Sequence, residues 1–352
     1  MSTARMVCLL ALVLGGCASR SPFGDDAATA APDAGGDSPP PTLGDASFAP
    51  GDVVVEALPQ CGAPTTPTSS TDVVMDPVFA NDYRSFVLGP VPGIPPSRLG
   101  GCVIDANDPN ALLVGVESEA PSGAIYSVPL QREPCGHIVG FAGNATLVAT
   151  TPYVDANLLY GPNQVMFYSE WPVNQLSEIL PQHSTPSYNI DLSSIGVGGG
   201  GPGGIGFVPP NLGDPGGLRA VTWPDGYWYH LTYAANSQQT FDITASTQTA
   251  TLPNGPGGFG YVPKGSPQFA NQSLITPEWS GDKVVVYEVD NMGDPLSQTR
   301  REFFNKFPKP WGAYFEPKTG DFLFLTWAAN GTDQIYIVQG FTQPPPPPPP
   351  PK

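Results

Sequence analysis

One short pattern recurs at a fixed spacing in this 352-residue chain. It combines glycine, an aromatic or branched residue and a closing proline, and its three closest copies lie at residues 204–209, 258–263 and 312–317. The closing prolines Pro209, Pro263 and Pro317 are 54 residues apart in both steps. Two weaker copies precede them, at residues 101–105 and 158–162. A period of this length indicates repeated supersecondary units that stack on one another.

Each copy is followed by segments rich in Val, Ile and Tyr, which is typical of β-strands. The segments expected as second strands are 111–116, 164–168, 218–222, 272–276 and 321–326. Those expected as third strands are 124–130, 227–233, 284–289 and 334–338, and fourth strands fit at 240–244 and 298–304. Tryptophans lie near the turn after four of the second strands, at Trp171, Trp223, Trp279 and Trp327.

Four short strands per repeat predict an all-β fold, a β-propeller of five or six four-stranded blades. In this fold, glycine lets the inner strands crowd near the axis, and aromatic side chains pack between blades. The alternative is a β-sandwich in which the Gly-Pro turns are equally spaced by coincidence. Gly 41 and Pro 45 in the whole chain favour short strands and turns over long helices in either case.

The last repeat ends near Phe341 after its third strand, which would leave one sheet edge unpaired. Two strand-like segments, 52–58 and 83–88, precede the first repeat. We expect one of them to supply the missing strand and close the ring. The sequence therefore divides into an N-terminal closing segment at 51–97 and the propeller domain at 98–342.

Residues 311–321, WGAYFEPKTGD, resemble the strand-and-turn motif of NHL-type and SMP-30/gluconolactonase-like propellers. The resemblance covers roughly residues 98–341 and implies the propeller fold. Functionally unrelated propellers share this motif, and no catalytic residue of these families maps onto the chain. The resemblance therefore implies no activity by itself.

The first 17 residues have the features of a bacterial export signal. Arg5 precedes an apolar run at 7–14 that is too short to span a bilayer, and Leu14-Gly15-Gly16-Cys17 resembles the lipobox of bacterial lipoproteins. The resemblance implies that residues 1–16 are a signal peptide and that Cys17 carries the lipid. Ala18 after the cysteine implies the outer membrane of a Gram-negative cell envelope. An ordinary signal peptide or a buried apolar segment is the alternative.

Low-complexity segments flank the domain at both ends. Residues 17–50 are mostly Ala, Asp, Gly, Pro and Ser, which predicts a disordered acidic tether. The tail at 343–352 contains eight consecutive prolines, 344–351, which favour an extended polyproline II conformation. This tail is either an inert spacer or a ligand for a partner with an aromatic groove.

Charged residues make up 13% of the chain, and the net charge is −17. A nucleic-acid partner is not expected, because phosphate binding needs a surface of Lys and Arg. The expected partners are the membrane, through the lipid, and an unidentified protein or carbohydrate ligand.

Three cysteines, Cys61, Cys102 and Cys135, would remain for the exported domain. An oxidising envelope permits one disulfide pair among them, and all three pairings stay open. Their spacings match no zinc-binding pattern.

The densest oxygen cluster is at Asp105, Asn107 and Asp108, where calcium is a candidate ligand. The cluster lacks the spacing of an EF-hand, and Asx-rich turns form for local hydrogen-bonding reasons alone. The three histidines, His137, His183 and His230, stand in no metal-binding spacing, and no nucleophile elbow or P-loop is present. The sequence thus assigns no catalytic residue and no cofactor other than this candidate calcium.

Three functions fit these observations. The first is a non-catalytic binding or scaffold module displayed at the cell envelope. The second is a metal-dependent hydrolase or lactonase of the SMP-30 type, supported by fold analogy. The third is an adhesion module with exposed aromatic residues such as Tyr227 and Trp228. Three or more Asp, Glu or Asn oxygens converging near the axis would favour the second function, whereas a channel lined by glycine and apolar groups would leave it without chemistry.

Overall fold

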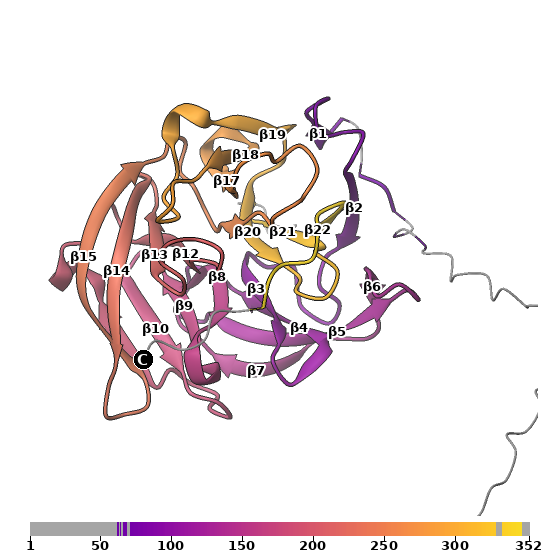
Figure 1. Cartoon of the computed structure of the whole chain (residues 1–352). Helices are drawn as coiled ribbons and strands as arrows, with labels where there is room; N and C mark the ends of the chain where they lie inside the picture. The colour runs from indigo at the N-terminus through magenta and orange to yellow at the C-terminus, as the bar shows by residue number, and fades with distance from the viewer. Residues whose placement is uncertain (1–61, 63, 65, 69–70, 329–332, 347–352) are drawn as a thin grey trace, which may run out of the picture. The chain divides into compact units, whose positions relative to one another are not determined.

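The computed structural model describes residues 62, 64, 66–68, 71–328 and 333–346. These residues contain 22 β-strands and four short 3-10 helices, and no α-helix lies among them. The strands form five antiparallel sheets that surround a common axis (Figure 1). The chain is therefore a five-bladed β-propeller, and the predicted all-β fold of four-stranded blades is confirmed.

The five blades follow one another in chain order. Blade I contains β3 (Leu99–Asp105), β4 (Asp108–Val116), β5 (Ala124–Arg132), β6 (Ile138–Phe141) and β7 (Thr146–Thr150), which pairs with β5. Blade II contains β8 (Val154–Tyr160), β9 (Met166–Glu170), β10 (Gln175–Ile179) and β11 (Tyr188–Asp191). Blade III contains β12 (Pro202–Phe207), β13 (Leu218–Thr222), β14 (Tyr227–Ala235) and β15 (Phe241–Thr251).

The last two blades each combine C-terminal strands with one N-terminal strand. Blade IV contains β16 (Gly260–Tyr261), β17 (Ser273–Glu278), β18 (Lys283–Glu288) and β19 (Arg301–Lys306), with β1 (Val74–Met75) at its outer edge. Blade V contains β20 (Pro310–Phe315), β21 (Phe322–Thr326), β22 (Ile335–Gln339) and β2 (Arg84–Gly89). The 3-10 helices are η1 (Pro162–Gln164), η2 (Leu192–Ile195), η3 (Trp279–Gly281) and η4 (Ser297–Thr299).

Blade V combines an N-terminal strand with the last three strands of the propeller. Strand β2 pairs antiparallel with β22, with Phe86 opposite Ile337, and the two lie side by side in Figure 1. Of the two segments expected to complete this blade, 83–88 coincides with β2, and 52–58 lies outside the described residues. Pairing with β2 satisfies the backbone groups that β22 would otherwise leave open at the sheet edge.

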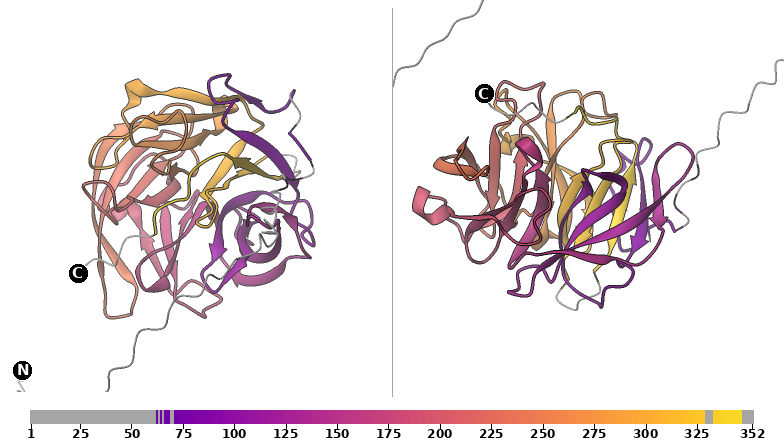
Figure 2. Two further views of the ribbon diagram at one scale, coloured as in Figure 1. Left: turned by 45° about the vertical axis from the view of Figure 1, so that its right-hand side comes forward. Right: turned by 90° about the horizontal axis from the view of Figure 1, so that it is seen from below.

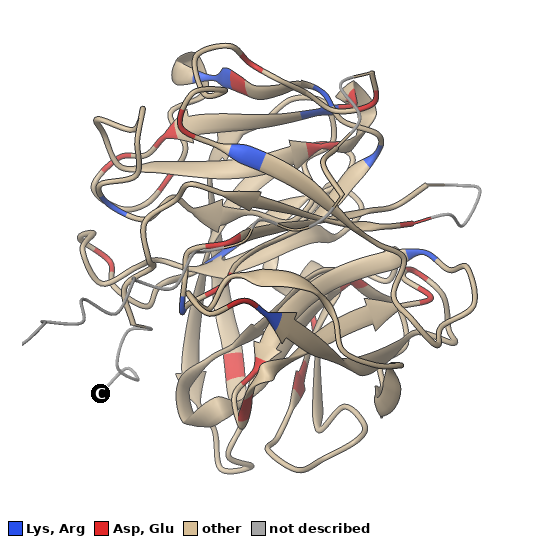
Figure 3. Ribbon diagram, turned by 90° about the vertical axis from the view of Figure 1, so that its right-hand side faces the viewer, with Lys and Arg blue, Asp and Glu red and all other residues tan. Residues whose placement is uncertain are grey.

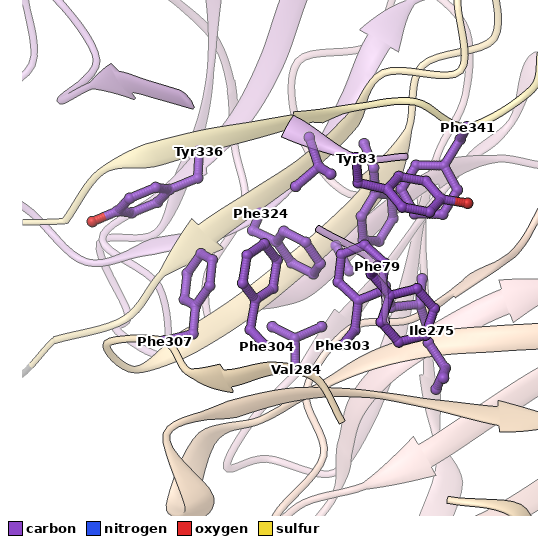
Figure 4. Packing of buried hydrophobic residues seen from close by; sticks show 14 of the residues in the cluster. Phe79, Tyr83, Ile275, Val284, Phe303, Phe304, Phe307, Phe324, Tyr336 and Phe341 are labelled. Carbon is purple, nitrogen blue, oxygen red and sulfur yellow. The ribbon is translucent and has the colours of Figure 1, made fainter. Parts of the chain in front are cut away.

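An aromatic cluster stabilises this closure between blades IV and V (Figure 4). The ring of Phe79 lies 4.7 Å from that of Phe303, and the ring of Tyr83 lies 4.5 Å from that of Phe341. Phe79 and Tyr83 are both fully buried. The N-terminal segment is therefore part of the core, because aromatic burial supplies most of the stabilisation in such a cluster.

The repeated glycines lie where the inner strands meet. A Cβ added to Gly312 would lie 2.3 Å from the carbonyl oxygen of Gly100, and one added to Gly204 would lie 2.5 Å from that of Gly257. No real Cβ contact is this short, so only glycine permits neighbouring inner strands to approach so closely. The repeated glycines in the sequence therefore mark the positions where the inner strands approach one another closely at the axis.

Two strand predictions in blade II differ from the structure. The expected strand 164–168 begins two residues later, at Met166, because Asn163 and Gln164 adopt left-handed backbone conformations in η1. The weak repeat copy at 158–162 covers only the end of β8, which starts at Val154. The two polar residues in β8, Asp155 and Asn157, hide the strand pattern in the sequence.

Charged side chains are sparse and scattered over the blades, and most of each ribbon is uncharged (Figure 3). No helix among the described residues is long and apolar enough to cross a membrane. The predicted signal peptide at 1–16, the tether at 17–50 and the lipidation residue Cys17 lie outside the described part of the chain.

Candidate functional sites at the two ends of the axis

The last residues of the five inner strands, β3, β8, β12, β16 and β20, meet at one end of the propeller, which we call the exit end. Together these residues line a single cavity of about 740 Å³. They are Asp105, Tyr160, Phe207, Tyr261 and Phe315. Figure 2 shows the propeller from two further sides. The closing prolines of the repeat follow three of these strand ends, and two of the prolines, Pro209 and Pro317, line the cavity themselves.

Aromatic and aliphatic side chains dominate the wall of the exit-end cavity. Tyr233 and Tyr261 use their hydroxyls to donate hydrogen bonds to the backbone carbonyls of Gly216, at 2.9 Å, and Gly293, at 2.8 Å. Burial raises the pKa of Tyr160 and of Tyr233 to about 12, so both phenols stay neutral at physiological pH. The cavity therefore presents neutral rings, and the polar tips of Tyr233 and Tyr261 are already engaged.

The start of the C-terminal proline run also lines this cavity, at Pro344, Pro345 and Pro346. The residues before it are firmly held. Phe341 is buried, and the Oγ1 of Thr342 donates a hydrogen bond to the Lys264 carbonyl at 3.1 Å. The described start of the tail, up to Pro346, therefore lies at the exit end beside the cavity.

The side chain of Asn157 forms the floor of the cavity at the axis. Its Nδ2 donates to the carbonyl of Ala313 at 3.1 Å, and its Oδ1 accepts from the backbone N–H of Ile205 at 3.1 Å and of Phe259 at 3.3 Å. One buried amide therefore links residues of blades II, III, IV and V. An amide suits this position because it supplies a donor and an acceptor to backbone groups that face the axis.

The opposite end, where the inner strands begin, is the entry end, and tryptophans form an arc there. Trp171, Trp223, Trp279 and Trp327 each directly follow the second strand of their blade. Consecutive rings pack edge to face, with centroids 4.9, 5.9 and 5.8 Å apart. The indole Nε1 of Trp171 donates to the Trp223 carbonyl at 3.2 Å, which ties one blade to the next.

Blade I interrupts this arc because Glu117, Ser118 and Glu119 follow its second strand in place of a tryptophan. The guanidinium of Arg98 lies over the Trp327 ring at 4.6 Å from its centroid. Arg98 also lowers the pKa of Glu119, but burial outweighs this and raises that pKa to about 7.

A buried carboxyl lies beside this interruption. Asp155 is fully buried, and its Oδ1 accepts a hydrogen bond from the Nε1 of Trp311 at 2.7 Å. Its other oxygen, Oδ2, has no hydrogen-bond partner among the described residues. Burial, together with the neighbouring Glu119, holds the pKa of Asp155 well above its ordinary value. The entry end therefore combines large aromatic side chains with acids that are costly to ionise.

Asp105, Asn107 and Asp108, the candidate calcium ligands, lie in the hairpin turn between β3 and β4. The Oδ1 of Asp105 accepts from the backbone N–H of Asn107 at 2.9 Å, and that of Asp108 accepts from the N–H of Asn110 at 2.9 Å. These are the local bonds of Asx turns. Among the residues described, no group of three or more His, Cys, Asp and Glu is arranged to hold a metal ion.

The three cysteines fall into two environments. Cys102 is a free, fully buried thiol in β3, and burial raises its pKa. Cys135 is disulfide-bonded. These observations leave the pair Cys61–Cys135 among the three alternatives, and it stays a prediction because Cys61 lies outside the described residues.

The expectation that Tyr227 and Trp228 are exposed adhesion anchors is wrong for Trp228. This indole is fully buried, and its Nε1 donates to Asp294 Oδ1 at 3.1 Å. Arg219 and His230 bind the same carboxylate, the former through Nε at 3.2 Å and the latter through Nε2 at 2.6 Å. The strand alternation of β14 turns Trp228 toward blade IV, whereas Tyr227 is only half-buried.

Comparison with known proteins finds distant structural similarities only. No family model matches it, and no curated protein is similar to it at a significant level. A luciferin-regenerating enzyme is 10% identical over 80% of this chain and 94% of its own, with a TM-score of 0.43. A proposed gluconolactonase is 11% identical over 78% and 99%, with a TM-score of 0.40. The PQQ-bound aldose sugar dehydrogenase of Streptomyces coelicolor is 13% identical over 79% and 95%, with a TM-score of 0.38.

Proposed function

We propose that this chain is an envelope-anchored lipoprotein whose propeller binds a ligand in the exit-end cavity without transforming it. The observation that carries the proposal is the cavity itself. Its volume of about 740 Å³ falls in the range of small-ligand sites, about 300–1,000 Å³. Its wall is mostly aromatic and aliphatic, and Asp105 is the single charged side chain among the described residues that line it.

This lining favours a ligand with uncharged, flat or apolar faces. Aromatic rings such as those of Tyr160 and Phe207 pack against apolar side chains and against the apolar faces of sugar rings. The sequence predicts an unidentified protein or carbohydrate ligand, and from the lining of the cavity we infer that the bound part of this ligand is uncharged. The exposed amides of Asn163 and Gln164 at the same cavity can supply hydrogen bonds that orient it.

A metal-dependent hydrolase or lactonase is the alternative, and it needs oxygen ligands that converge on the axis. The oxygen that reaches the axis at the cavity floor is Asn157 Oδ1, which already accepts two backbone hydrogen bonds. Metal analysis of the purified chain, paired with thermal melts in chelator and in calcium, tests this alternative. A bound metal together with a melting temperature that rises in calcium would favour the hydrolase over a binding module.

Titration with Nile red, an uncharged apolar fluorophore, tests ligand binding at the exit end. The Cys17→Ser chain lacks the thiol needed for lipid attachment, so the experiment needs no detergent. We expect one dye per chain, and weaker binding when Tyr160→Ala removes one aromatic wall of the cavity. The matched control is Tyr126→Ala on β5, which is also half-buried but does not line the cavity. Equal dye binding by both variants would contradict the proposed site.

The cellular address is proposed from the sequence. Cleavage before Cys17 and lipidation of its thiol would anchor the propeller to the outer membrane through the 17–50 tether. Mass spectrometry of the mature N-terminus should find a lipid-modified Cys17, and Cys17→Ser should abolish both the modification and membrane fractionation. An unmodified N-terminus at another residue would contradict the anchor and leave the binding site unaffected.

A further inference from the structure

The exit-end cavity and the C-terminal proline run are in contact in the same molecule. We propose that this cavity is a binding site for polyproline II segments and that the chain's own run, beginning at Pro344, is its tethered ligand. This inference rests on the proposed ligand site at the exit end and names the chemical class of the ligand. It assigns a role to a tail that would otherwise be a spacer.

The first support is the composition of the two surfaces. Pro344, Pro345 and Pro346 line the cavity together with Tyr160, Phe207 and other aromatic residues. Polyproline II segments are recognised when proline rings pack into aromatic-lined grooves, and the preformed helix loses little conformational entropy on binding. Pro344 is already half-buried, whereas Pro345 and Pro346 are exposed at the mouth.

The second support is the balance of hydrogen-bonding groups. Proline has no backbone N–H, so a run of prolines brings only carbonyl acceptors into an apolar cavity. The exposed side-chain amides of Asn163 and Gln164, both at the cavity, can donate to such carbonyls. A peptide of ordinary residues would instead bury unpaired N–H donors there, which weakens binding.

The third support is the attachment of the tail. Phe341, three residues before the run, is buried with its ring 5.0 Å from that of Phe315, which lines the cavity. The backbone N–H of Thr342 donates to Ser266 Oγ at 3.2 Å. The first proline is therefore held at the cavity mouth, and a short tether of this kind gives a ligand an effective concentration of about 1 mM.

The inference is tested with a fluorescein-labelled peptide of eight prolines and three forms of the Cys17→Ser chain. One form is full length, one ends at Gln343, and one has residues 344–351 replaced by alternating Gly and Ser. Fluorescence polarisation should show one peptide bound per truncated chain. The full-length chain should bind about tenfold or more weakly, because its own run competes at high effective concentration. The Gly-Ser chain should bind as the truncated chain does.

Two controls establish that the site is the aromatic cavity. In the truncated chain, Tyr160→Ala should weaken peptide binding by about tenfold, in line with the loss of a stacking contact, and Tyr126→Ala should leave it unchanged. A Gly-Ser peptide of equal length should not bind. Thermal melts of each form show whether it is folded, and the Gly-Ser chain serves if the truncated one is unstable.

The other possible results of these binding experiments would each contradict either the polyproline inference or the proposed ligand site. If the truncated and Gly-Ser chains bind Nile red one to one but not the proline peptide, the polyproline inference fails and the proposed function stands. If they bind neither probe, both fail. If the full-length and truncated chains bind the peptide equally, the tail is not a tethered ligand and the inference is overturned.

Discussion

The two ends of the propeller axis are built from similar aromatic side chains but differ in how those side chains are used. At the entry end, Trp171, Trp223, Trp279 and Trp327 pack on one another and link adjacent blades. At the exit end, aromatic rings surround a cavity of about 740 Å³ and leave it open to a ligand. The arrangement of the rings distinguishes the two ends, because rings that pack on one another link adjacent blades, whereas rings around a void remain available for binding.

This difference is mirrored in the polar groups of each end. Asp155 and Glu119 at the entry end have raised pKa values because they are buried. At the exit end, the polar tips of Tyr233 and Tyr261 are tied to backbone carbonyls. The contacts at the entry end therefore link the blades, whereas the side chains at the exit end form a mostly uncharged surface. Four substitutions test this division.

The largest effect is expected at the entry end. Trp311→Ala should lower the free energy of unfolding by about 4 kcal/mol, because it leaves a cavity between inner strands and removes the donor to Asp155. Urea unfolding followed by circular dichroism measures the loss. Trp311→Phe, which keeps most of the ring volume, should cost clearly less. Equal losses for both variants would show that the hydrogen bond, and not ring packing, accounts for the effect.

Asn157 lies between the two ends, and its replacement should have the next largest effect. Asn157→Ala leaves two backbone N–H groups and one carbonyl without their partner, which should cost about 3 kcal/mol. Asn157→Asp keeps the acceptor and loses the donor, so it should cost less at low pH, where the carboxyl is protonated. A wild-type melting temperature in the Ala variant would refute the role of Asn157 as a link between blades.

The buried acids predict a moderate pH dependence. The folded chain retains protons on Asp155 and Glu119 at pH values where the unfolded chain has released them, so stability should fall as pH rises from about 4.5 to 7 and beyond. Asp155→Asn removes part of this dependence, because an amide cannot ionise, and should stabilise the fold at pH 9 much more than at pH 4. Thermal melts between pH 4 and pH 9 measure the effect, and Asp108→Asn, which alters an exposed carboxyl, is the control. If the melting temperature of Asp155→Asn depends on pH as that of the unaltered chain does, the Asp155 carboxyl does not ionise in this pH range.

The smallest effect on stability is expected at the exit end. Tyr160→Ala should change the free energy of unfolding by no more than about 1 kcal/mol, because a half-buried ring at a cavity loses few contacts. The same variant should weaken Nile red binding. A loss as large as that of Trp311→Ala would show that the exit-end rings are structural, and the distinction between the two ends would disappear.

Much of the functional geometry could have been read from the sequence. The closing prolines mark the ends of three inner strands, two of them line the exit-end cavity, and the repeated tryptophans mark the entry end. Asp155 and Asn157 were missed, although two polar residues two apart in an apolar strand lie on one face and indicate a buried polar role. The prediction that Trp228 is exposed was wrong, because strand alternation alone does not show which face of a blade is covered by its neighbour.

By itself, the sequence determined the repeat unit, its strands, the glycines at the axis and the need for a strand from the N-terminal side. These follow from local constraints, since period, turn chemistry and the absence of a Cβ act within a few residues. The folded structure was needed to establish the number of blades, the central role of Asn157 and the contact of the first three prolines of the run with the aromatic cavity. Those features depend on which residues distant in sequence come together when the ring closes.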